Sequence, residues 1–135
     1  QLAINEAGIT PPEVAYINTH GTATPIGDVA EVKAIQQLFG EHAYALNITS
    51  SKSMLGHTMG AAGAVEAIIS ILSMQQGMVT PTINHEQGDE DPNIDYRLNF
   101  TFNQAQQRNI HYAMSNNYGF GGQNACLLFK NPNIQ

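Results

Sequence analysis

Charge, cysteine and long apolar runs are all scarce in this sequence. Charged residues make up 12% of the chain, and its 5 lysines and arginines do not cluster, which argues against nucleic acid and anionic membranes as partners. No apolar run reaches the ~20 residues that a membrane-spanning helix needs. The single cysteine, Cys126, excludes a framework of intrachain disulfides and favours a reducing compartment. We therefore expect a cytoplasmic protein without a membrane partner.

What remains is an acidic composition of modest size. The 135 residues are 42% hydrophobic, which is enough for one domain with its own core, and a net charge of −6 is ordinary for an enzyme. The chain begins at Gln1 with neither Met nor a signal-like segment. We therefore expect residues 1–135 to form one domain of a longer protein.

Helical and strand-like patterns alternate along the chain. Runs rich in β-branched and aromatic residues predict extended segments or strands at residues 14–18, 46–49, 79–83, 99–102, 111–116 and 125–130. Helical spacing and glycine stop signals predict helices at residues 2–7, 29–39 and 58–76. Asp28 suits the N-cap of the second helix. The order of the elements argues for an α/β fold with a mixed sheet.

Residues 50–66 join a turn rich in Gly and Ser to the most apolar helix of the chain. Lys52 and His57 lie on the turn, and the helix begins with small residues and continues with large apolar ones. A helix that is apolar on nearly every side is usually buried on nearly every side. One sheet of this size cannot cover it, so we expect this chain alone to leave an apolar patch of the helix exposed. Glu66 lies within this run and, because a buried acid needs a partner, we expect it to pair with Lys52. A tight turn and a core helix joined by a structural ion pair explain these residues equally well.

Two histidines lie where an α/β sheet often binds its ligands. His20 lies just beyond the strand at 14–18, and His57 precedes the helix at 58–76, whose dipole favours a neutral imidazole. Without a carboxylate at ligand spacing, two histidines make a poor zinc site. Two neutral imidazoles and a lysine suit the stabilisation of an oxyanion or enolate instead. The other histidines lack such a setting and are expected on the surface or in strands: His42, His85 and His111.

Three motifs resemble the C-terminal motifs of the β-ketoacyl-acyl-carrier-protein synthases. They are THGTATPIGD at residues 19–28, KSMLGH at 52–57 and NYGFGGQN at 117–124. The resemblance covers the whole chain and is greatest to the type II elongating enzymes of bacterial fatty-acid synthesis. It implies a thiolase-like fold, in which two related α/β halves build a layered αβαβα body that usually forms a homodimer. This chain resembles the C-terminal half only.

The same resemblance implies the reaction and the residues that perform it. A cysteine of the N-terminal half takes an acyl chain from acyl-carrier protein; malonyl-carrier protein then loses carbon dioxide, and its carbanion attacks the acyl thioester. The resemblance implies catalytic roles for His20, His57, Lys52, Glu66 and Phe120, and substrate-binding roles for Thr22, Thr24, Gly121 and Gly122. It implies no cofactor beyond the phosphopantetheine arm of acyl-carrier protein, which carries the substrates.

Each implied role is specific. The two histidines match those that bind the malonyl thioester oxygen, and Lys52 with Glu66 matches a buried pair that orders the site. Thr22 and Thr24 match hydroxyls that hold the phosphopantetheine arm, and Phe120 matches a gate residue whose N–H helps form an oxyanion hole. Cys126 lies mid-strand in an apolar run, where a thiol is normally a small core residue, and is not expected to be the nucleophile.

Two other functions remain open on the sequence alone. The ketosynthase domain of a polyketide synthase shares all three motifs. A non-catalytic partner subunit, which sets chain length in ketosynthase heterodimers, generally lacks the two histidines that are present here. Tyr118 and Gln123 stand where the family often has Phe and Thr, and these departures affect the gate rather than the chemistry. Without its N-terminal half the isolated chain is expected to be inactive.

Overall fold

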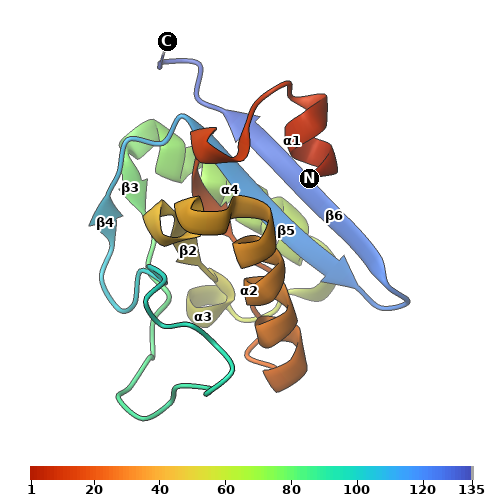
Figure 1. Ribbon diagram of the computed structural model, residues 1–135, viewed down its shortest axis with the longest axis vertical. Coiled ribbons are helices and arrows are strands. Elements are labelled where there is room, and N and C mark those ends of the chain that lie inside the picture. Colours follow the sequence, from red (N-terminus) through yellow and green to blue (C-terminus); the bar gives the residue numbers. More distant parts are fainter. Residues whose placement is uncertain (135) are drawn as a thin grey trace.

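A four-stranded mixed sheet organises the structure, a computed structural model that describes residues 1–134 (Figure 1). Its strands are β1 (Val14–Asn18), β2 (Asn47–Thr49), β5 (Tyr112–Gly119) and β6 (Gln123–Lys130). They lie in the order β2–β1–β5–β6. β1 is parallel to both β2 and β5, whereas β6 is antiparallel to β5. The predicted α/β fold with a mixed sheet is therefore confirmed.

Helices cover the sheet on both faces. The longer ones are α1 (Leu2–Glu6), α2 (Pro25–Phe39) and α4 (Ala62–Gln76). In Figure 1, α2 lies in front of the sheet and α4 lies behind it. Two separate apolar clusters result: Ile17 and Ile35 belong to one, and Tyr16 and Met74 belong to the other. Tyr16 and Ile17 belong to different clusters because successive side chains of a strand point to opposite faces of the sheet. The chain thus forms three layers, helix, sheet and helix.

Shorter elements connect these layers, and the strand predicted at residues 99–102 is not among them. The connecting elements are α3 (Lys52–Leu55), the 3₁₀ turns Pro11–Glu13, Gly40–Ala45 and Met59–Ala61, and a small sheet of β3 (Met78–Val79) with β4 (Gln106–Gln107). Residues 99–102 form only isolated bridges, because a positive φ of 50° at Thr101 interrupts the extended backbone. Of residues 79–83, only Val79 lies in a strand, and β4 was not predicted.

α2 begins earlier than its pattern predicted. Pro25 is its first residue and Thr24 occupies the N-cap position. Proline is favoured at this position because its fixed φ suits the first helical turn. The N–H that proline lacks would have no acceptor within the helix there. The prediction that Asp28 is the N-cap is therefore wrong. Asp28 lies in the first turn, and its carboxylate accepts a hydrogen bond from the Thr22 N–H (3.2 Å).

α4 is buried on one side only. Its inward face is partly polar, with Glu66 and Ser70 buried, whereas Ile68 and Leu72 are 57% and 46% exposed. The sheet covers a single face of the helix, so the expectation that this chain alone leaves an apolar patch of the helix uncovered is confirmed for residues 1–134. An exposed apolar face of this kind marks an interface. None of the helices in residues 1–134, α4 included, has the length and apolar content to cross a membrane.

The residues of β6 are also more exposed to solvent than its apolar sequence predicted. It is the edge strand of the sheet, and most of its residues are exposed. Cys126 is one of these exposed residues. The prediction that Cys126 is a small core residue is therefore wrong, because an edge strand is paired on one side only and an apolar run does not reveal this position.

The apolar face of α4 leads to a prediction for the isolated chain. Residues 1–135 expressed alone should self-associate, because exposed Ile68 and Leu72 favour contact over hydration. Sedimentation velocity should show a broad distribution of sedimentation coefficients. This distribution should become narrower in the matched variant Ile68→Gln/Leu72→Gln. Intact mass should show no acyl group on Cys126 after incubation with a thioester donor. A monodisperse, cooperatively melting monomer that becomes acylated at Cys126 would contradict both expectations.

Candidate active site

His20 and His57 meet at the carboxyl edge of the sheet. His20 follows β1, and His57 follows α3, the short helix after β2. Because β1 and β2 are parallel, the segments that leave their carboxyl ends start from the same edge. The centroids of the two imidazoles are 5.5 Å apart and the ring planes meet at 87°. The structure therefore brings together the two histidines that the sequence singled out.

Backbone amides fix the orientation of both imidazoles. The Tyr118 N–H donates to Nδ1 of His20 (3.3 Å), and the Met59 N–H donates to Nδ1 of His57 (3.2 Å). Met59 reaches this position in a left-handed conformation (φ 51°), which residues other than glycine rarely adopt. A ring nitrogen that accepts a hydrogen bond carries no proton, so the neutral ring is protonated at Nε2. Each histidine thus presents one Nε2–H donor.

The environment of His20 favours the neutral imidazole. Burial lowers the pKa of His20 below its ordinary value of 6.5, and the positive charge of Lys52 and the neighbouring His57 ring lower it further, against an opposing effect of Glu66. Protonation would also place a proton on Nδ1, where the Tyr118 amide already donates. His20 is therefore held as a neutral hydrogen-bond donor at neutral pH.

Lys52 and Glu66 form the buried pair that the sequence predicted. Lys52 Nζ lies 2.5 Å from Glu66 Oε1, and the two side chains are 5% and 3% exposed. The second carboxylate oxygen of Glu66 accepts a hydrogen bond from the side-chain amide of Asn117 (2.9 Å). Asn117 was not singled out beforehand, although it opens the third motif. Glu66 therefore connects α3, α4 and β5 beneath the two histidines.

Glu31 is the functional-site residue that the sequence analysis missed. It is only 4% exposed, and one carboxylate oxygen accepts from the His20 N–H (3.1 Å) and from Asn116 Nδ2 (3.2 Å), while the other accepts from the Gly21 N–H (3.0 Å). Burial raises the pKa of Glu31, although these donors oppose the shift. Its position one turn before the buried Ile35 was the available signal, since that spacing turns Glu31 inward.

The first motif borders a cavity of about 490 Å³. Thr22 lines this cavity together with Lys52 and His57. Thr24 lies outside its wall, but its hydroxyl is 3.1 Å from that of Thr22. Aromatic side chains close the far side of the cavity: Tyr96, Phe100 and Phe102. The structure thus places Thr22 at the site and Thr24 beside it.

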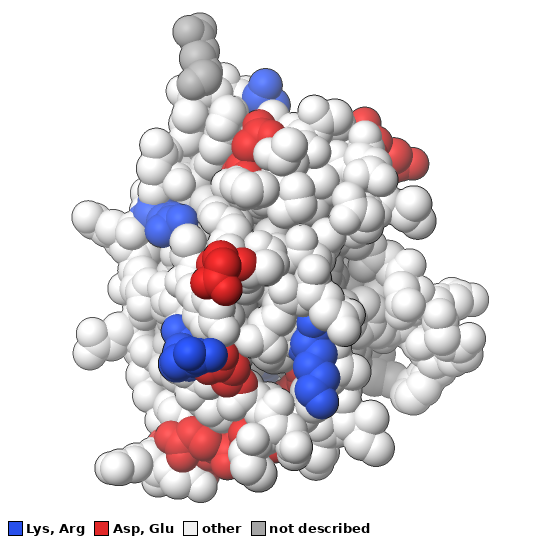
Figure 2. Space-filling view, in the orientation of Figure 1, with Lys and Arg blue, Asp and Glu red and all other residues white. Residues whose placement is uncertain are grey.

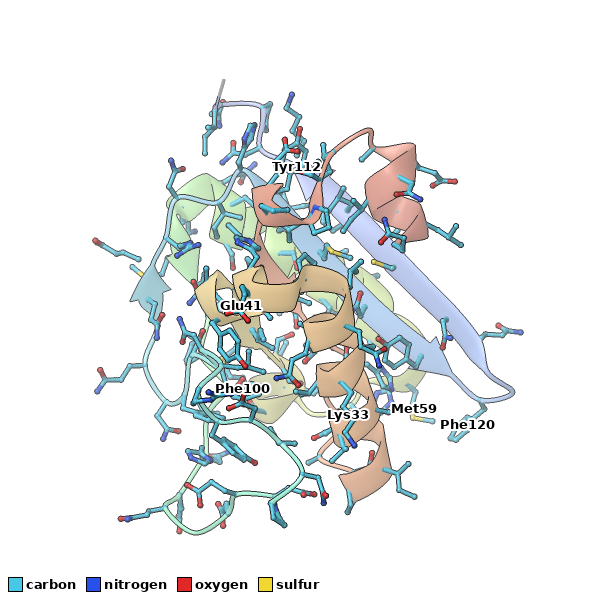
Figure 3. All side chains as sticks on the ribbon, in the orientation of Figure 1. Lys33, Glu41, Met59, Phe100, Tyr112 and Phe120 are labelled. Carbon is cyan, nitrogen blue, oxygen red and sulfur yellow. The ribbon has the colours of Figure 1, made fainter. Side chains whose placement is uncertain are left out.

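Phe120 is the one predicted catalytic residue that remains apart from the others. It is 94% exposed at the turn between β5 and β6, and Figure 3 shows it at the tip of that hairpin. Gly121 and Gly122 both adopt φ of 82°, a conformation that suits glycine and makes this tight turn possible. No ring contact joins Phe120 to either imidazole within residues 1–134. The turn approaches the site through Tyr118 instead.

Charged side chains are few on the face that Figure 2 shows, and the described residues gather no set of metal ligands. Figure 2 shows isolated basic side chains among acidic ones on a face that is mostly uncharged. Within residues 1–134, no group of three or more His, Cys, Asp or Glu side chains could hold a metal ion. The chemistry available from the described residues is therefore hydrogen-bond donation by two imidazoles, supported by a buried ion pair.

Comparison with known proteins assigns the chain to a family. Residues 1–86 match the family described as "Beta-ketoacyl synthase, C-terminal domain". The chain is 52% identical over 130 residues to 3-oxoacyl-[acyl-carrier-protein] synthase 2 of Staphylococcus aureus (strain COL), a match that covers 96% of this chain and 30% of the relative. The chain thus spans about 30% of the length of this curated relative.

Solved structures agree in both fold and family. A β-ketoacyl synthase from Burkholderia phymatum STM815 matches with a TM-score of 0.87 and 40% identity, covering 96% of this chain and 30% of that one. A type II PKS ketosynthase, solved with its acyl-carrier protein and bound to the hexaketide, matches with a TM-score of 0.89 and 34% identity, covering 96% of this chain and 31% of that one.

The sheet and its helical layers have the thiolase-like fold of the solved ketosynthases. Within this class, the chain belongs to the β-ketoacyl synthase family and matches its C-terminal domain. The resemblance that the three motifs indicated is therefore confirmed.

Proposed function

We propose that this chain is the C-terminal half of a 3-oxoacyl-acyl-carrier-protein synthase, an acyltransferase that elongates fatty acids by decarboxylative condensation. One observation carries the proposal. Two imidazoles with centroids 5.5 Å apart each accept a backbone amide at Nδ1, which leaves two Nε2–H donors at one site. The 52% identity to a protein of that name supports the choice of reaction. The N-terminal half supplies the nucleophilic cysteine.

The two imidazoles serve the decarboxylation of malonyl-carrier protein. The malonyl thioester oxygen accepts both Nε2–H groups. The electron pair of the bond to the carboxylate carbon moves toward the thioester as carbon dioxide leaves, and negative charge develops on that oxygen. The resulting carbanion then attacks the acyl-cysteine thioester, forms the new carbon–carbon bond and expels the cysteine thiolate. Donors aimed at such developing charge in a water-poor site are worth about 3 kcal/mol each.

The remaining residues position the substrates and the histidines. Burial is the main cause that keeps the His20 imidazole neutral, and the positive charge of Lys52, which is paired with Glu66, adds to it. Thr22 and Thr24 hold the phosphopantetheine arm of malonyl-carrier protein at the mouth of the cavity. In the complete protein the turn closes over the acyl-cysteine, where Phe120 acts as its gate and Gly121 and Gly122 border the substrate. No cofactor other than the substrate arm takes part.

The same proposal covers assembly and location. Acyl-carrier protein is the partner, as it is in the solved ketosynthase complex. The N-terminal half covers the apolar face of α4, which accounts for the exposure of Ile68 and Leu72 in this chain. The complete protein is a cytoplasmic homodimer, which the family resemblance implies.

The fatty-acid reaction is favoured over the two alternatives. A polyketide ketosynthase would share the fold, but the type II PKS structure is 34% identical to this chain, against 52% for the 3-oxoacyl synthase. A non-catalytic partner subunit would not need two oriented imidazoles, yet His20 and His57 both keep their amide partners.

The pH dependence of the complete protein tests the proposal. With acyl- and malonyl-carrier proteins it should release carbon dioxide and form 3-oxoacyl-carrier protein in equal amounts. Because the pKa of His20 lies below 6.5, this activity should persist as the pH falls through 6.5 and decline only at lower pH. Between the pKa of His20 in the folded protein and its ordinary value of 6.5, the unfolded state binds more protons than the folded state does. His20 therefore makes the free energy of unfolding rise with pH across this interval. Absence of both products at every pH would contradict the proposal.

A further inference from the structure

The hydroxyl of Thr24 is paired with that of Thr22 and does not cap the helix that follows it. The two Oγ1 atoms lie 3.1 Å apart, and Thr22 lines the same cavity as Lys52 and His57. Thr24 occupies the N-cap position of α2, where a threonine hydroxyl usually accepts a hydrogen bond from an amide of the first helical turn. Its side chain makes no capping hydrogen bond in the part of the chain that the structure describes. The Thr24 hydroxyl is therefore directed toward Thr22.

Gly27 leaves the space that this pair of hydroxyls occupies. It lies in the first turn of α2, three residues after Thr24. A Cβ atom at position 27 would lie 2.5 Å from Thr24 Oγ1 and 4.0 Å from Thr22 Oγ1. Because a Cβ atom essentially never approaches another heavy atom to less than 3.0 Å, the Thr24 hydroxyl would have to rotate away. The observed position of this hydroxyl thus requires a residue without a Cβ atom at position 27.

Neither backbone conformation nor packing against other residues accounts for a glycine here. Gly27 is helical and is not among the glycines with positive φ, so its backbone does not require glycine. It is exposed, and the three atoms nearest to a Cβ at this position all belong to Thr22 and Thr24. Glycine also weakens a helix relative to alanine, because it loses more conformational freedom on folding. In the described part of the chain, the hydroxyl pair is therefore the feature that explains Gly27.

We propose that Gly27 is a positioning residue, which strengthens the binding of an amide-bearing thioester by leaving room for the paired hydroxyls of Thr22 and Thr24. The inference rests on the proposed function, in which these two threonines hold the phosphopantetheine arm. The arm contains amide groups, whose carbonyl oxygens accept hydrogen bonds. When one hydroxyl of the pair donates to the other, the second keeps its proton for such a carbonyl. Rotation of Thr24 would break the pair and remove this arrangement.

The test is Gly27→Ala in the complete protein. The KM for malonyl-carrier protein should rise about fivefold, the effect of one lost hydrogen bond, while kcat for decarboxylation stays within about twofold. KM rises alone because the arm is bound equally in the ground state and in the transition state. The denaturant midpoint should not fall, since alanine is the better helix former. A crystal structure of the variant should show the Thr24 hydroxyl rotated away from Thr22.

Two comparisons isolate the hydroxyl. Thr24→Ala should raise KM by the same factor, and Gly27→Ala in that background should raise it no further, because no hydroxyl remains to be displaced. Ala30→Gly makes the reverse exchange at an exposed position of the same helix, three residues after Gly27. It should lower the denaturant midpoint and leave KM unchanged, which separates helix stability from binding of the arm.

The outcomes separate this inference from the proposed function. An unchanged KM in Gly27→Ala overturns the inference, and so does a fivefold rise that persists in the Thr24→Ala background or a loss of kcat as large as the rise in KM. A Gly27→Ala protein that fails to fold also overturns it, because rotation of one exposed side chain would then not relieve the contact. The crystal structure needs no turnover. An unaltered complete protein that fails to decarboxylate malonyl-carrier protein would therefore overturn the proposed function, while a rotated Thr24 would still confirm the displacement of its hydroxyl.

Discussion

Replacing His20 or His57 by Ala in the complete protein is expected to abolish measurable decarboxylation of malonyl-carrier protein. Each substitution removes one of the two Nε2–H donors that, in the proposed function, face the developing enolate oxygen. Loss of one such donor lowers a rate by about 10²–10³-fold. The nucleophilic cysteine should still become acylated, because that step does not use the malonyl oxygen. Carbon dioxide release and intact mass measure the two steps separately.

A matched control is available at the opposite end of β5. His111 precedes Tyr112, whereas the hairpin that approaches the site lies at the far end of the strand. His111→Ala should therefore keep near-normal decarboxylation. Near-normal rates in both His20→Ala and His57→Ala would contradict the assignment of the two donors, and loss of acylation together with decarboxylation would indicate a folding defect instead.

Glu66→Ala is expected to lower both the stability and the activity of the complete protein. The substitution leaves the Lys52 ammonium buried without its carboxylate and also removes the acceptor of Asn117. Breaking one partner of a buried ion pair typically costs about 3–5 kcal/mol. The denaturant midpoint and the rate of decarboxylation report the two effects.

The double variant Lys52→Met/Glu66→Leu provides the decisive comparison for stability. It removes both charges, so it should be more stable than Glu66→Ala, although it should remain inactive. Glu86→Ala, at an exposed acid of the 84–93 segment, should change neither quantity. If Glu66→Ala proved as stable as Glu86→Ala, the buried Lys52–Glu66 pair would not stabilise the fold, and this part of the account would be contradicted.

The site was largely predictable because its residues follow strand ends. His20 follows β1, and Lys52 and His57 follow β2, so parallel pairing of these strands starts both segments from one edge. The partner of Glu66 was predictable from burial alone, since Lys52 was the nearest cation along the chain. Neither inference required the detailed path of the loops.

Glu31 was not predictable in the same way, because two of its three hydrogen-bond donors are backbone amides. The His20 and Gly21 N–H groups that bind it leave no mark in the residue types of the sequence. The exposed position of Cys126 was missed for a related reason. Apolar residues show that a surface tends to be covered, but not which segment covers it.

The tautomers of His20 and His57 test the central claim most directly. Nitrogen-15 NMR of the complete protein, labelled at histidine and assigned with the two alanine variants, distinguishes a protonated ring nitrogen from an unprotonated one. At neutral pH both residues should show Nδ1 unprotonated and Nε2 protonated, because each Nδ1 accepts a backbone amide. A proton on Nδ1 of either ring would contradict the account, since that ring could not present an Nε2–H donor in its neutral form.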